Sequence, residues 1–209
     1  MPARGDHDAR REDVSEAVWR VLAAHGFSGL TLRAVATEMG ASTGLVTHYF
    51  PNKKALVRYA VRLADERTQA RARRRPERPG LVALRAALLD VLPLGPDAVT
   101  MNRMWVGFWG AALADPALHE GEAARYANWR ARLLPHVVEA QRRGELDSAA
   151  GSEDLVAIAA SFTHGLVVQV LFDPENFPPE RQISLLDSFL DGFSGGAGSH
   201  GRVAPRAPR

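Results

Sequence analysis

The 209-residue chain contains no cysteine. Disulfide bonds, thiolate metal sites and cysteine nucleophiles are therefore excluded. The histidines are scattered, and none pairs with a carboxylate or a second histidine at metal-ligand spacing. His119 and Glu120, for example, are adjacent and would point apart on a helix. We expect no metal site and no cofactor.

Long apolar runs are also missing. The chain opens on the charged segment MPARGDHDARRED, so we do not expect a secretory signal. The apolar stretches further along are interrupted by His, Gln or Asp, and we expect none to reach the length of a membrane span. These features predict a soluble, cytoplasmic protein without a membrane partner.

Motifs of common catalytic sites are absent as well. The chain has no G-x-S-x-G nucleophile turn and no G-x-x-x-x-G-K-[ST] phosphate loop. We therefore expect no catalytic residue. An enzyme on a helical scaffold remains an alternative that a pocket with paired titratable groups would revive.

What the sequence does contain is helical periodicity, with no strand pattern and no internal repeat. The prediction is an all-α fold, in which an N-terminal three-helix unit is joined to a larger C-terminal helical domain. The family resemblance described below implies that the first is a helix-turn-helix DNA-binding domain and the second a ligand-binding and dimerisation domain. Pro135 is expected to kink one of the helices. The predicted helices cover residues 11–25, 32–39, 43–50, 52–73, 81–92, 97–114, 116–143, 152–172 and 179–193.

The domain boundary is expected within the helix that starts at Asn52. We predict a DNA-binding domain at residues 1–60, a ligand-binding and dimerisation domain at 61–193, and a disordered tail at 194–209 that is rich in Gly, Ser, Pro and Arg. The first eight residues are polar and are expected to be mobile. The arginines near them are either a basic arm that reaches DNA or part of a frayed tail; they are Arg4, Arg10 and Arg11.

The charge is unevenly distributed along the chain. Residues 61–79 carry 7 basic and 3 acidic side chains, whereas residues 80–192 carry 8 basic and 15 acidic side chains. A basic front and an acidic body suit a protein that docks on DNA at one end. The arginine run at 71–75 is either a second phosphate contact or a solvated helix end.

Residues 30–56 have the order expected of a helix-turn-helix. Thr31 is a plausible N-cap, Gly40 allows the chain to leave the first helix, and Ser42 or Thr43 can cap the second. Lys53 and Lys54 then occupy the first turn of a further helix, where a positive charge opposes the helix dipole. That placement is favourable if a phosphate backbone lies nearby.

This stretch closely resembles the DNA-binding signature of the TetR family of repressors. The matching residues are Thr31, Val35-Ala36, Gly40, Ser42, Gly44, His48-Tyr49-Phe50, Lys53 and Leu56. The resemblance implies a homodimer on double-stranded operator DNA with inverted-repeat symmetry. We assign base contacts to Thr43, Thr47 and His48. Thr47 departs from the aromatic residue frequent in the family. Contacts to the DNA backbone are assigned to Thr31, Ser42, Tyr49, Lys53 and Lys54.

The body resembles the BetI-type subgroup of that family, which is typified by a choline-responsive repressor. The matching segments are Met104–Trp109 and Asp115–Leu118, with Tyr126, Trp129, Arg130 and Leu133 downstream. The resemblance implies a pocket for a small-molecule effector that is cationic or hydrophobic. Its candidate residues are Asn102, Trp105, Phe108, Trp109, Tyr126, Trp129 and His164.

The tryptophans of this set allow two interpretations. Trp105 and Trp109 are four residues apart and share a helix face. They either contribute to an aromatic cage for a cation, or they belong to an aromatic core stripe. His164, in an apolar helix, is likewise either a ligand contact or a core histidine.

The last two predicted helices are apolar on more than one face, which requires neighbours on several sides. Burial within one subunit is one solution. The resemblance implies the other, a dimer in which two helices from each subunit form a four-helix bundle. The candidate interface residues are Leu155, Ile158, Phe162, Leu166, Ile183, Leu186, Phe189 and Leu190.

The sequence therefore predicts a transcriptional repressor that is released from its operator by a small molecule. The alternative from another class is a ligand sensor or carrier that acts without operator binding.

Overall fold

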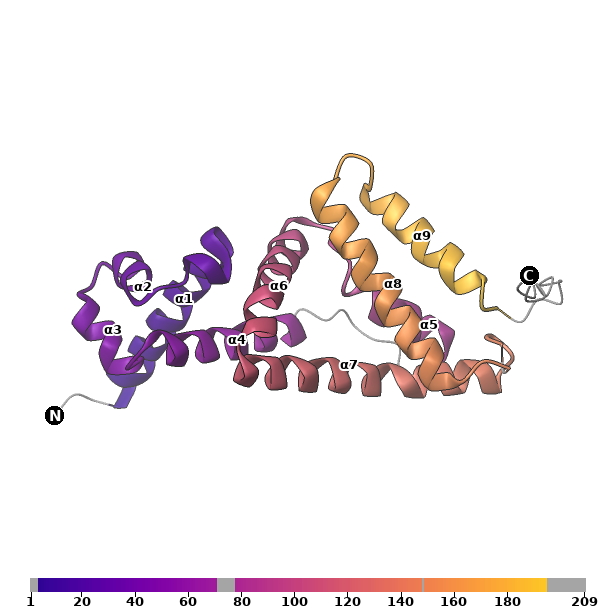
Figure 1. Cartoon of the computed structure of the whole chain (residues 1–209), viewed down its shortest axis with the longest axis horizontal. Helices are drawn as coiled ribbons and strands as arrows, with labels where there is room; N and C mark the ends of the chain where they lie inside the picture. Colours follow the sequence, from indigo (N-terminus) through magenta and orange to yellow (C-terminus); the bar gives the residue numbers. More distant parts are fainter. Residues whose placement is uncertain (1–3, 71–77, 148, 195–209) are drawn as a thin grey trace, which may run out of the picture.

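The computed structural model describes residues 4–70, 78–147 and 149–194, with side chains described from Glu12 onward. The described residues form nine helices and no strand, as the sequence predicts (Figure 1). The helices are α1 (Arg4–Gly29), α2 (Leu32–Glu38), α3 (Thr43–Tyr49), α4 (Lys53–Ala70), α5 (Leu81–Leu89), α6 (Pro96–Ala114), α7 (Pro116–Arg142), α8 (Ser152–Phe172) and α9 (Pro179–Asp191).

Local chemistry sets the boundaries of the first three helices. α1 breaks at Gly26, where φ is +62°, and this is where the sequence predicts its end. Thr31 caps α2 by accepting a hydrogen bond from the Ala34 N–H at 3.0 Å. Gly40, with φ of +61°, turns the chain after α2 in a conformation that side chains with a Cβ rarely adopt.

Two other expectations about chain ends have different outcomes. α1 begins at Arg4 rather than Arg11, so the helix includes residues 4–8 of the segment that was expected to be mobile. The side chains of Arg4, Arg10 and Arg11, the arginine run at 71–75 and the tail at 195–209 lie outside the described residues.

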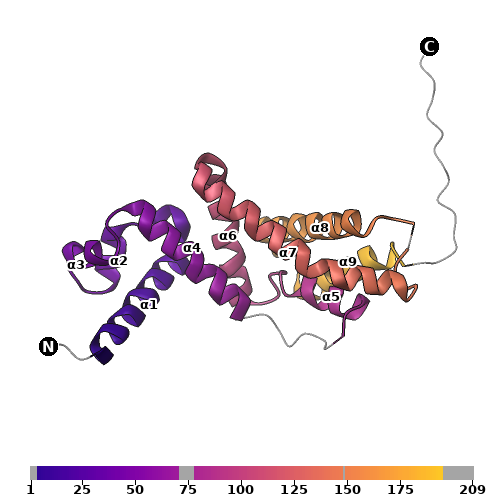
Figure 2. The ribbon, with the colours of Figure 1, turned by 90° about the horizontal axis from the view of Figure 1, so that it is seen from below.

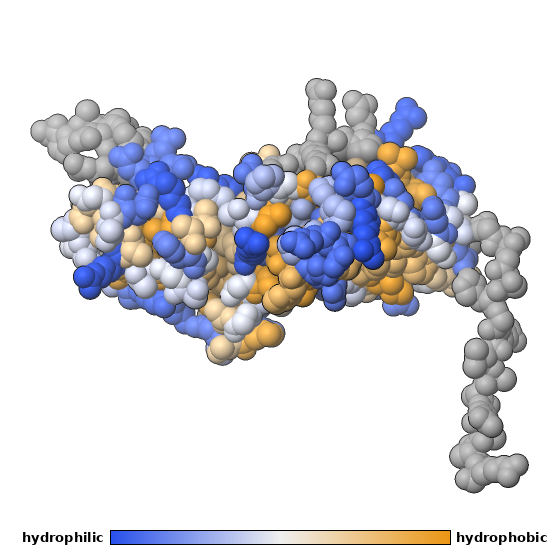
Figure 3. All heavy atoms as spheres, turned by 90° about the horizontal axis from the view of Figure 1, so that it is seen from above, coloured by the Kyte–Doolittle hydropathy of each residue, from blue (hydrophilic) through white to orange (hydrophobic). Residues whose placement is uncertain are grey.

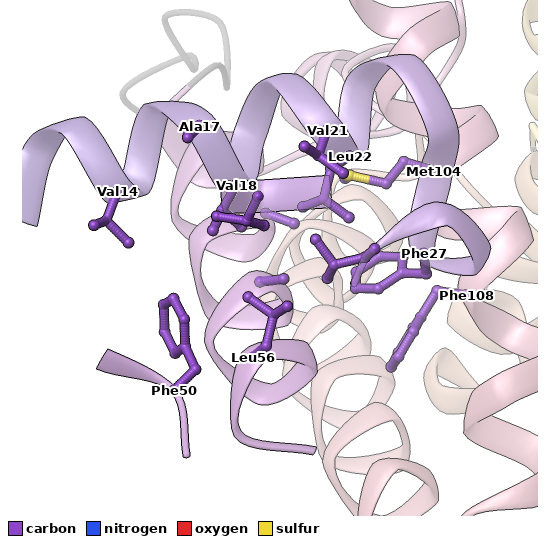
Figure 4. Close-up of a cluster of buried hydrophobic side chains, with 14 of the residues drawn as sticks. Val14, Ala17, Val18, Val21, Leu22, Phe27, Phe50, Leu56, Met104 and Phe108 are labelled. Atoms are coloured by element: carbon purple, nitrogen blue, oxygen red, sulfur yellow. The ribbon is translucent and has the colours of Figure 1, made fainter. Parts of the chain in front are cut away.

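The N-terminal helices and α6 share one hydrophobic core. Its members come from α1, α2, α3 and α4 and, across the predicted domain boundary, from α6. Phe27 of α1 faces Phe108 of α6 with ring centroids 4.6 Å apart, and Phe50 lies below Val14 (Figure 4). Because α6 is part of this core, the position of α1 is fixed relative to the body.

The second core lies among α5, α7, α8 and α9. Arg85 of α5 and Asp187 of α9 add a bidentate ion pair, with N···O distances of 2.5 and 2.9 Å. α7 continues as one helix through Pro135, where the sequence predicts a kink. In Figure 1, α7 runs along one side of the body while α8 and α9 lie together at the end away from α1–α3; Figure 2 shows α4 between the two parts.

α8 differs from expectation in one respect. By length and composition it could cross a membrane, whereas the sequence analysis expected no such segment. Of its most apolar window, 44% is buried within the subunit. Core helices of soluble proteins pass the same test, and α8 contacts α5, α6 and α7.

Candidate DNA-binding surface and effector cavity

α3 has a buried face and an exposed face. Val46 is fully buried in the N-terminal core, whereas Thr43, Thr47 and His48 are exposed, as a recognition helix requires. The hydroxyl of Thr47 donates to the Gly44 carbonyl at 2.9 Å, so its oxygen can still accept a hydrogen bond. Tyr49 is half-buried at the end of the helix, with its ring 5.6 Å from that of His48.

The two predicted capping hydroxyls are occupied locally. Ser42 accepts a hydrogen bond from the Leu45 N–H at 3.3 Å, and Thr31 accepts from Ala34. Both hydroxyl hydrogens therefore remain available to donate to a phosphate oxygen. The caps place these groups at the N-terminal ends of α2 and α3, where the helix dipole also favours an anion.

The two lysines of α4 differ in their surroundings. Lys53 is exposed and makes no ion pair with any residue that the structure describes. Lys54 lies 3.5 Å from Asp115, the residue that caps α7. Lys54 therefore links α4 to the body, and a phosphate would have to compete with Asp115 for it.

A cavity of about 290 Å³ lies between α4 and the body. Five of the seven predicted effector contacts line it: Asn102, Trp105, Trp109, Trp129 and His164. The remaining walls come from α4, α5 and α7, among them Thr68 and Asp65. α4 therefore forms part of the cavity wall.

His164 lies among three aromatic rings. Its centroid is 5.7 Å from Trp109, 5.1 Å from Tyr126 and 4.8 Å from Trp129. Burial, aided by the positive charge of Arg125, lowers the pKa of His164 from 6.5 to about 4. The imidazole is therefore neutral at physiological pH and can offer one donor and one acceptor to a ligand.

A largely buried ion pair between Glu122 and Arg125 lies beside the same cavity, which Arg125 lines. Their side chains approach to 2.6 Å and are only 10% and 23% exposed. The Arg125 guanidinium lies 4.2 Å from the Trp105 ring centroid and 5.1 Å from that of Tyr126. The chain thus already places a cation of its own on two predicted effector contacts.

This ion pair between Glu122 and Arg125 was not predicted from the sequence. Glu122 also accepts a hydrogen bond from Trp109 Nε1 at 3.1 Å, and Trp105 Nε1 donates to the Thr68 hydroxyl at 3.1 Å. The i,i+3 spacing of Glu122 and Arg125 was a visible signal of pairing. Nothing in the sequence showed that the pair would be buried against the tryptophans.

Three predicted effector contacts, Asn102, Phe108 and Tyr126, are held by other parts of the subunit. Asn102 donates to the carbonyls of Val91 and Ala98 at 2.9 Å, which leaves its side-chain oxygen for a ligand. Phe108 is buried in the N-terminal core and does not line this cavity. Tyr126 does not line the cavity itself but contacts two residues that do, His164 and Arg125, and burial raises its pKa.

The predicted dimer residues divide into two groups. Four are buried in the second core and have no surface to offer a partner: Leu155, Leu166, Leu186 and Leu190. The others keep exposed or partly exposed side chains: Ile158, Phe162, Ile183 and Phe189. Phe162 and Phe189 stack at 4.1 Å and join α8 to α9.

Together these features define a class of protein. A helix-turn-helix with an exposed recognition face, joined through α4 to a helical body that contains a cavity, is the architecture of a DNA-binding transcriptional regulator. The part of the chain that the structure describes contains no cluster of His, Cys, Asp or Glu that could hold a metal ion.

Comparison with known protein families gives the same result. Residues 81–195, more than half of the chain, match the family described as BetI-type transcriptional repressor, C-terminal. Residues 15–60 match the bacterial regulatory proteins of the tetR family. The chain therefore belongs to the TetR family of transcriptional regulators and, by its body, to the BetI-type group.

Individual relatives agree with this placement. The BetI regulator of Paraburkholderia phymatum is 29% identical over 91% of this chain and 96% of its own length. The PksA regulator of Bacillus subtilis is 25% identical over 87% of this chain and 88% of its own. These relatives are transcriptional regulators and not enzymes.

Solved structures share the fold. A transcriptional regulator from Rhodococcus sp. Rha1 superposes with a TM-score of 0.75 at 26% identity, covering 87% of this chain and 94% of that one. A regulator from Saccharomonospora viridis, solved in complex with choline, superposes with a TM-score of 0.77 at 20% identity, covering 88% and 96%. The fold and the function of a helix-turn-helix DNA-binding regulator are thus established for this chain.

Proposed function

We propose that this regulator is a repressor released from its operator by a small molecule bound in the cavity beside α4. The observation that carries the proposal is that α4 forms one wall of the cavity through Asp65 and Thr68. α4 begins at Lys53, shortly after the recognition helix ends at Tyr49. A ligand that displaces α4 therefore displaces the recognition helix with it.

The contacts between α4 and the body supply the coupling. Trp105 donates to the hydroxyl of Thr68, and that hydroxyl donates to the carbonyl of Ala64 at 2.7 Å. A ligand that takes the place of the Trp105 indole removes a restraint on α4. The ligand then favours a conformation of the dimer with a different spacing of the two recognition helices. Operator affinity falls by the ratio of the ligand's affinities for this conformation and for the one that binds the operator.

We propose a compact effector that is apolar or cationic. Three tryptophans line a cavity of about 290 Å³, and carboxylates of Asp65 and Asp90 share its wall. The choline found in the Saccharomonospora viridis structure is a ligand of this class. Because Arg125 already covers Trp105, a cationic ligand would use the faces of Trp109 and Trp129 or displace the guanidinium.

The operator is proposed to be an inverted repeat read by a homodimer that assembles in the cytoplasm. An apolar stripe along α8 supplies the dimer surface through Ile158, Phe162 and Phe172. Gly165 lies on the same stripe, and a Cβ added there would meet no atom within 4 Å, so a partner helix could approach closely. Figure 3 shows that the larger apolar patches in that view lie over the body.

Sedimentation velocity tests the dimer with a matched pair of variants. Ile158 and Val138 are both exposed aliphatic residues, at 45% and 48%, but only Ile158 lies on the α8 stripe. Ile158→Lys should produce monomers, and Val138→Lys should sediment as the wild type. A monomeric wild type, or a dimer unaffected by Ile158→Lys, would contradict the proposed interface.

Release is tested by fluorescence anisotropy of a labelled duplex taken from the upstream intergenic DNA. Choline, benzyltrimethylammonium and 3,3-dimethylbutanol, a neutral analogue of choline, are each titrated into the complex. Release by a cation but not by the neutral alcohol identifies a cation site; release by both identifies an apolar site. Trp129→Ala should raise the concentration needed. If no compound releases the complex or raises the melting temperature of the protein, the proposed effector class is wrong.

A further inference from the structure

A second and larger cavity lies outside the proposed effector site. This groove has a volume of about 790 Å³ and runs between α4 and the first half of α7. It reaches the end of α3, because Tyr49 and Phe50 are among its lining residues. The groove therefore touches both the DNA-reading unit and the body.

The lining residues of the groove carry an excess of positive charge. Arg58, Arg62 and Arg132 make no ion pair with any residue in the described part of the chain. Arg125 is neutralised by Glu122, which leaves Asp65 as the remaining acid among the described lining residues.

Asp65 does not neutralise that excess. One of its carboxylate oxygens accepts a hydrogen bond from Gln69 at 2.7 Å, so that oxygen is engaged on its own helix. Three arginines against one carboxylate give the groove a net charge of about +2 from its described residues. A concave site focuses such a charge and raises the local concentration of anions.

The walls between these arginines are apolar and aromatic. Phe50 and Tyr59 pack with ring centroids 5.0 Å apart, and Leu118 of α7 lies among the residues across the groove. Arg62 lies 5.8 Å from the Tyr59 ring centroid. An arginine held over an aromatic ring beside an apolar wall suits a ligand with an anionic group on an apolar body.

We propose that this groove is a second ligand site, specific for an organic anion that joins a carboxylate or sulfonate to an apolar or aromatic body. Arg58 and Arg62 line only the groove, whereas Arg125 and Arg132 line both this groove and the effector cavity. The two sites are therefore neighbours with opposite ligand preference. The groove favours anions, and the tryptophan-lined cavity favours cations or neutral apolar molecules.

DNA phosphate is the other anion that these arginines could meet. The groove geometry argues against that role, because α7 of the body forms the opposite wall and both α4 arginines line the space between the two helices. A phosphate backbone has little apolar surface to place against the wall that Phe50, Tyr59 and Leu118 form, whereas an organic anion with an apolar body has one. The organic anion is therefore the better match.

The probe for the test is 1-anilinonaphthalene-8-sulfonate, whose fluorescence rises when it binds an apolar site. N-phenyl-1-naphthylamine has the same rings without the sulfonate and serves as the neutral control. The double variant Arg58→Gln/Arg62→Gln is compared with Arg103→Gln/Arg130→Gln, which removes two exposed arginines that line neither cavity. All four exchanged side chains are exposed, so each variant should fold as the wild type does.

The groove variant should bind the sulfonate about tenfold more weakly, and the control variant should bind it as the wild type does. Neither variant should change the affinity for the neutral probe, and His164→Ala should leave sulfonate binding intact. Equal sulfonate affinity in the two double variants would overturn the proposal. So would loss of sulfonate binding in His164→Ala, because that places the anion in the effector cavity. No DNA enters this assay, so its failure is independent of operator release.

Discussion

The Glu122–Arg125 pair offers the sharpest test of the packing around the effector cavity. Replacing Glu122 by Gln removes the charge but keeps an oxygen that can accept from Trp109 Nε1. Arg125 is then left 23% exposed beside aromatic rings, without its carboxylate. Because burial alone would lower the Arg125 pKa, and the hydrogen bond and charge of Glu122 reverse that effect, the substitution exposes the full cost of burying the cation.

Removing one partner of a buried pair costs about 3–5 kcal/mol, and we expect about 3 kcal/mol here because Arg125 keeps some access to water. For a chain of this size that corresponds to a fall in melting temperature of about 6–12 °C. The matched control is Glu139→Gln on the same helix. Glu139 pairs with Arg142 and Arg143, which are 70% and 38% exposed, and their hydrogen bonds and charges lower its pKa to about 2. Because both arginines reach water, the fall in melting temperature should be clearly smaller than for Glu122→Gln.

A double-mutant cycle completes the test. Arg125→Met should also destabilise the protein, and the double variant should be less damaged than the sum of the single variants by about 1.5 kcal/mol or more. Thermal unfolding is measured at one protein concentration, because dimer dissociation would otherwise shift the midpoint. If Glu122→Gln has the same melting temperature as Glu139→Gln, or if the effects of the two single substitutions at Glu122 and Arg125 simply add, the pair is not the buried, coupled unit described here.

Three further predictions concern the DNA-binding unit and His164. Lys53→Ala should reduce the slope of log operator affinity against log salt concentration by about one unit. Lys54→Ala should reduce that slope less, because Lys54 already pairs with Asp115, and the same slope in both variants would contradict this. Phe50→Ala should lower the free energy of unfolding by about 3–5 kcal/mol in denaturant titrations, and a loss below about 1 kcal/mol would mean that its site collapses. Because the folded pKa of His164 is about 4, below 6.5, the unfolded chain takes up the proton first as the pH falls. The free energy of unfolding should therefore fall by about 2 kcal/mol through His164 as the pH is lowered from about 7.5 to about 5. If a His164→Gln variant loses as much stability as the wild type over this range, the assignment is refuted.

Local features were predictable from the sequence because their causes are local. Thr31 and Ser42 cap α2 and α3 through bonds to residues three positions on, and Gly40 has the positive φ that its place after a helix indicated. The spacing of Trp105 and Trp109 placed both on one side of α6, and both line the same cavity.

The partners of those tryptophans were not predictable, because they come from other helices. The Trp105 indole bonds Thr68 of α4, and the Trp109 indole bonds Glu122 of α7. Periodicity shows that a face is apolar but not which neighbour covers it. For the same reason Leu155 and Leu186, assigned to a dimer surface, are buried against α5 and α7 of their own subunit.

The most direct test of the central claim is a mobility shift of the purified protein on its own upstream intergenic DNA, at two salt concentrations and with an excess of unrelated competitor. The account predicts a discrete complex that resists the competitor and weakens steeply with salt, as a dimer with several phosphate contacts should. Diffuse binding that the competitor removes would contradict sequence-specific recognition at this site. The alternative of a sensor that acts without operator binding would then be favoured.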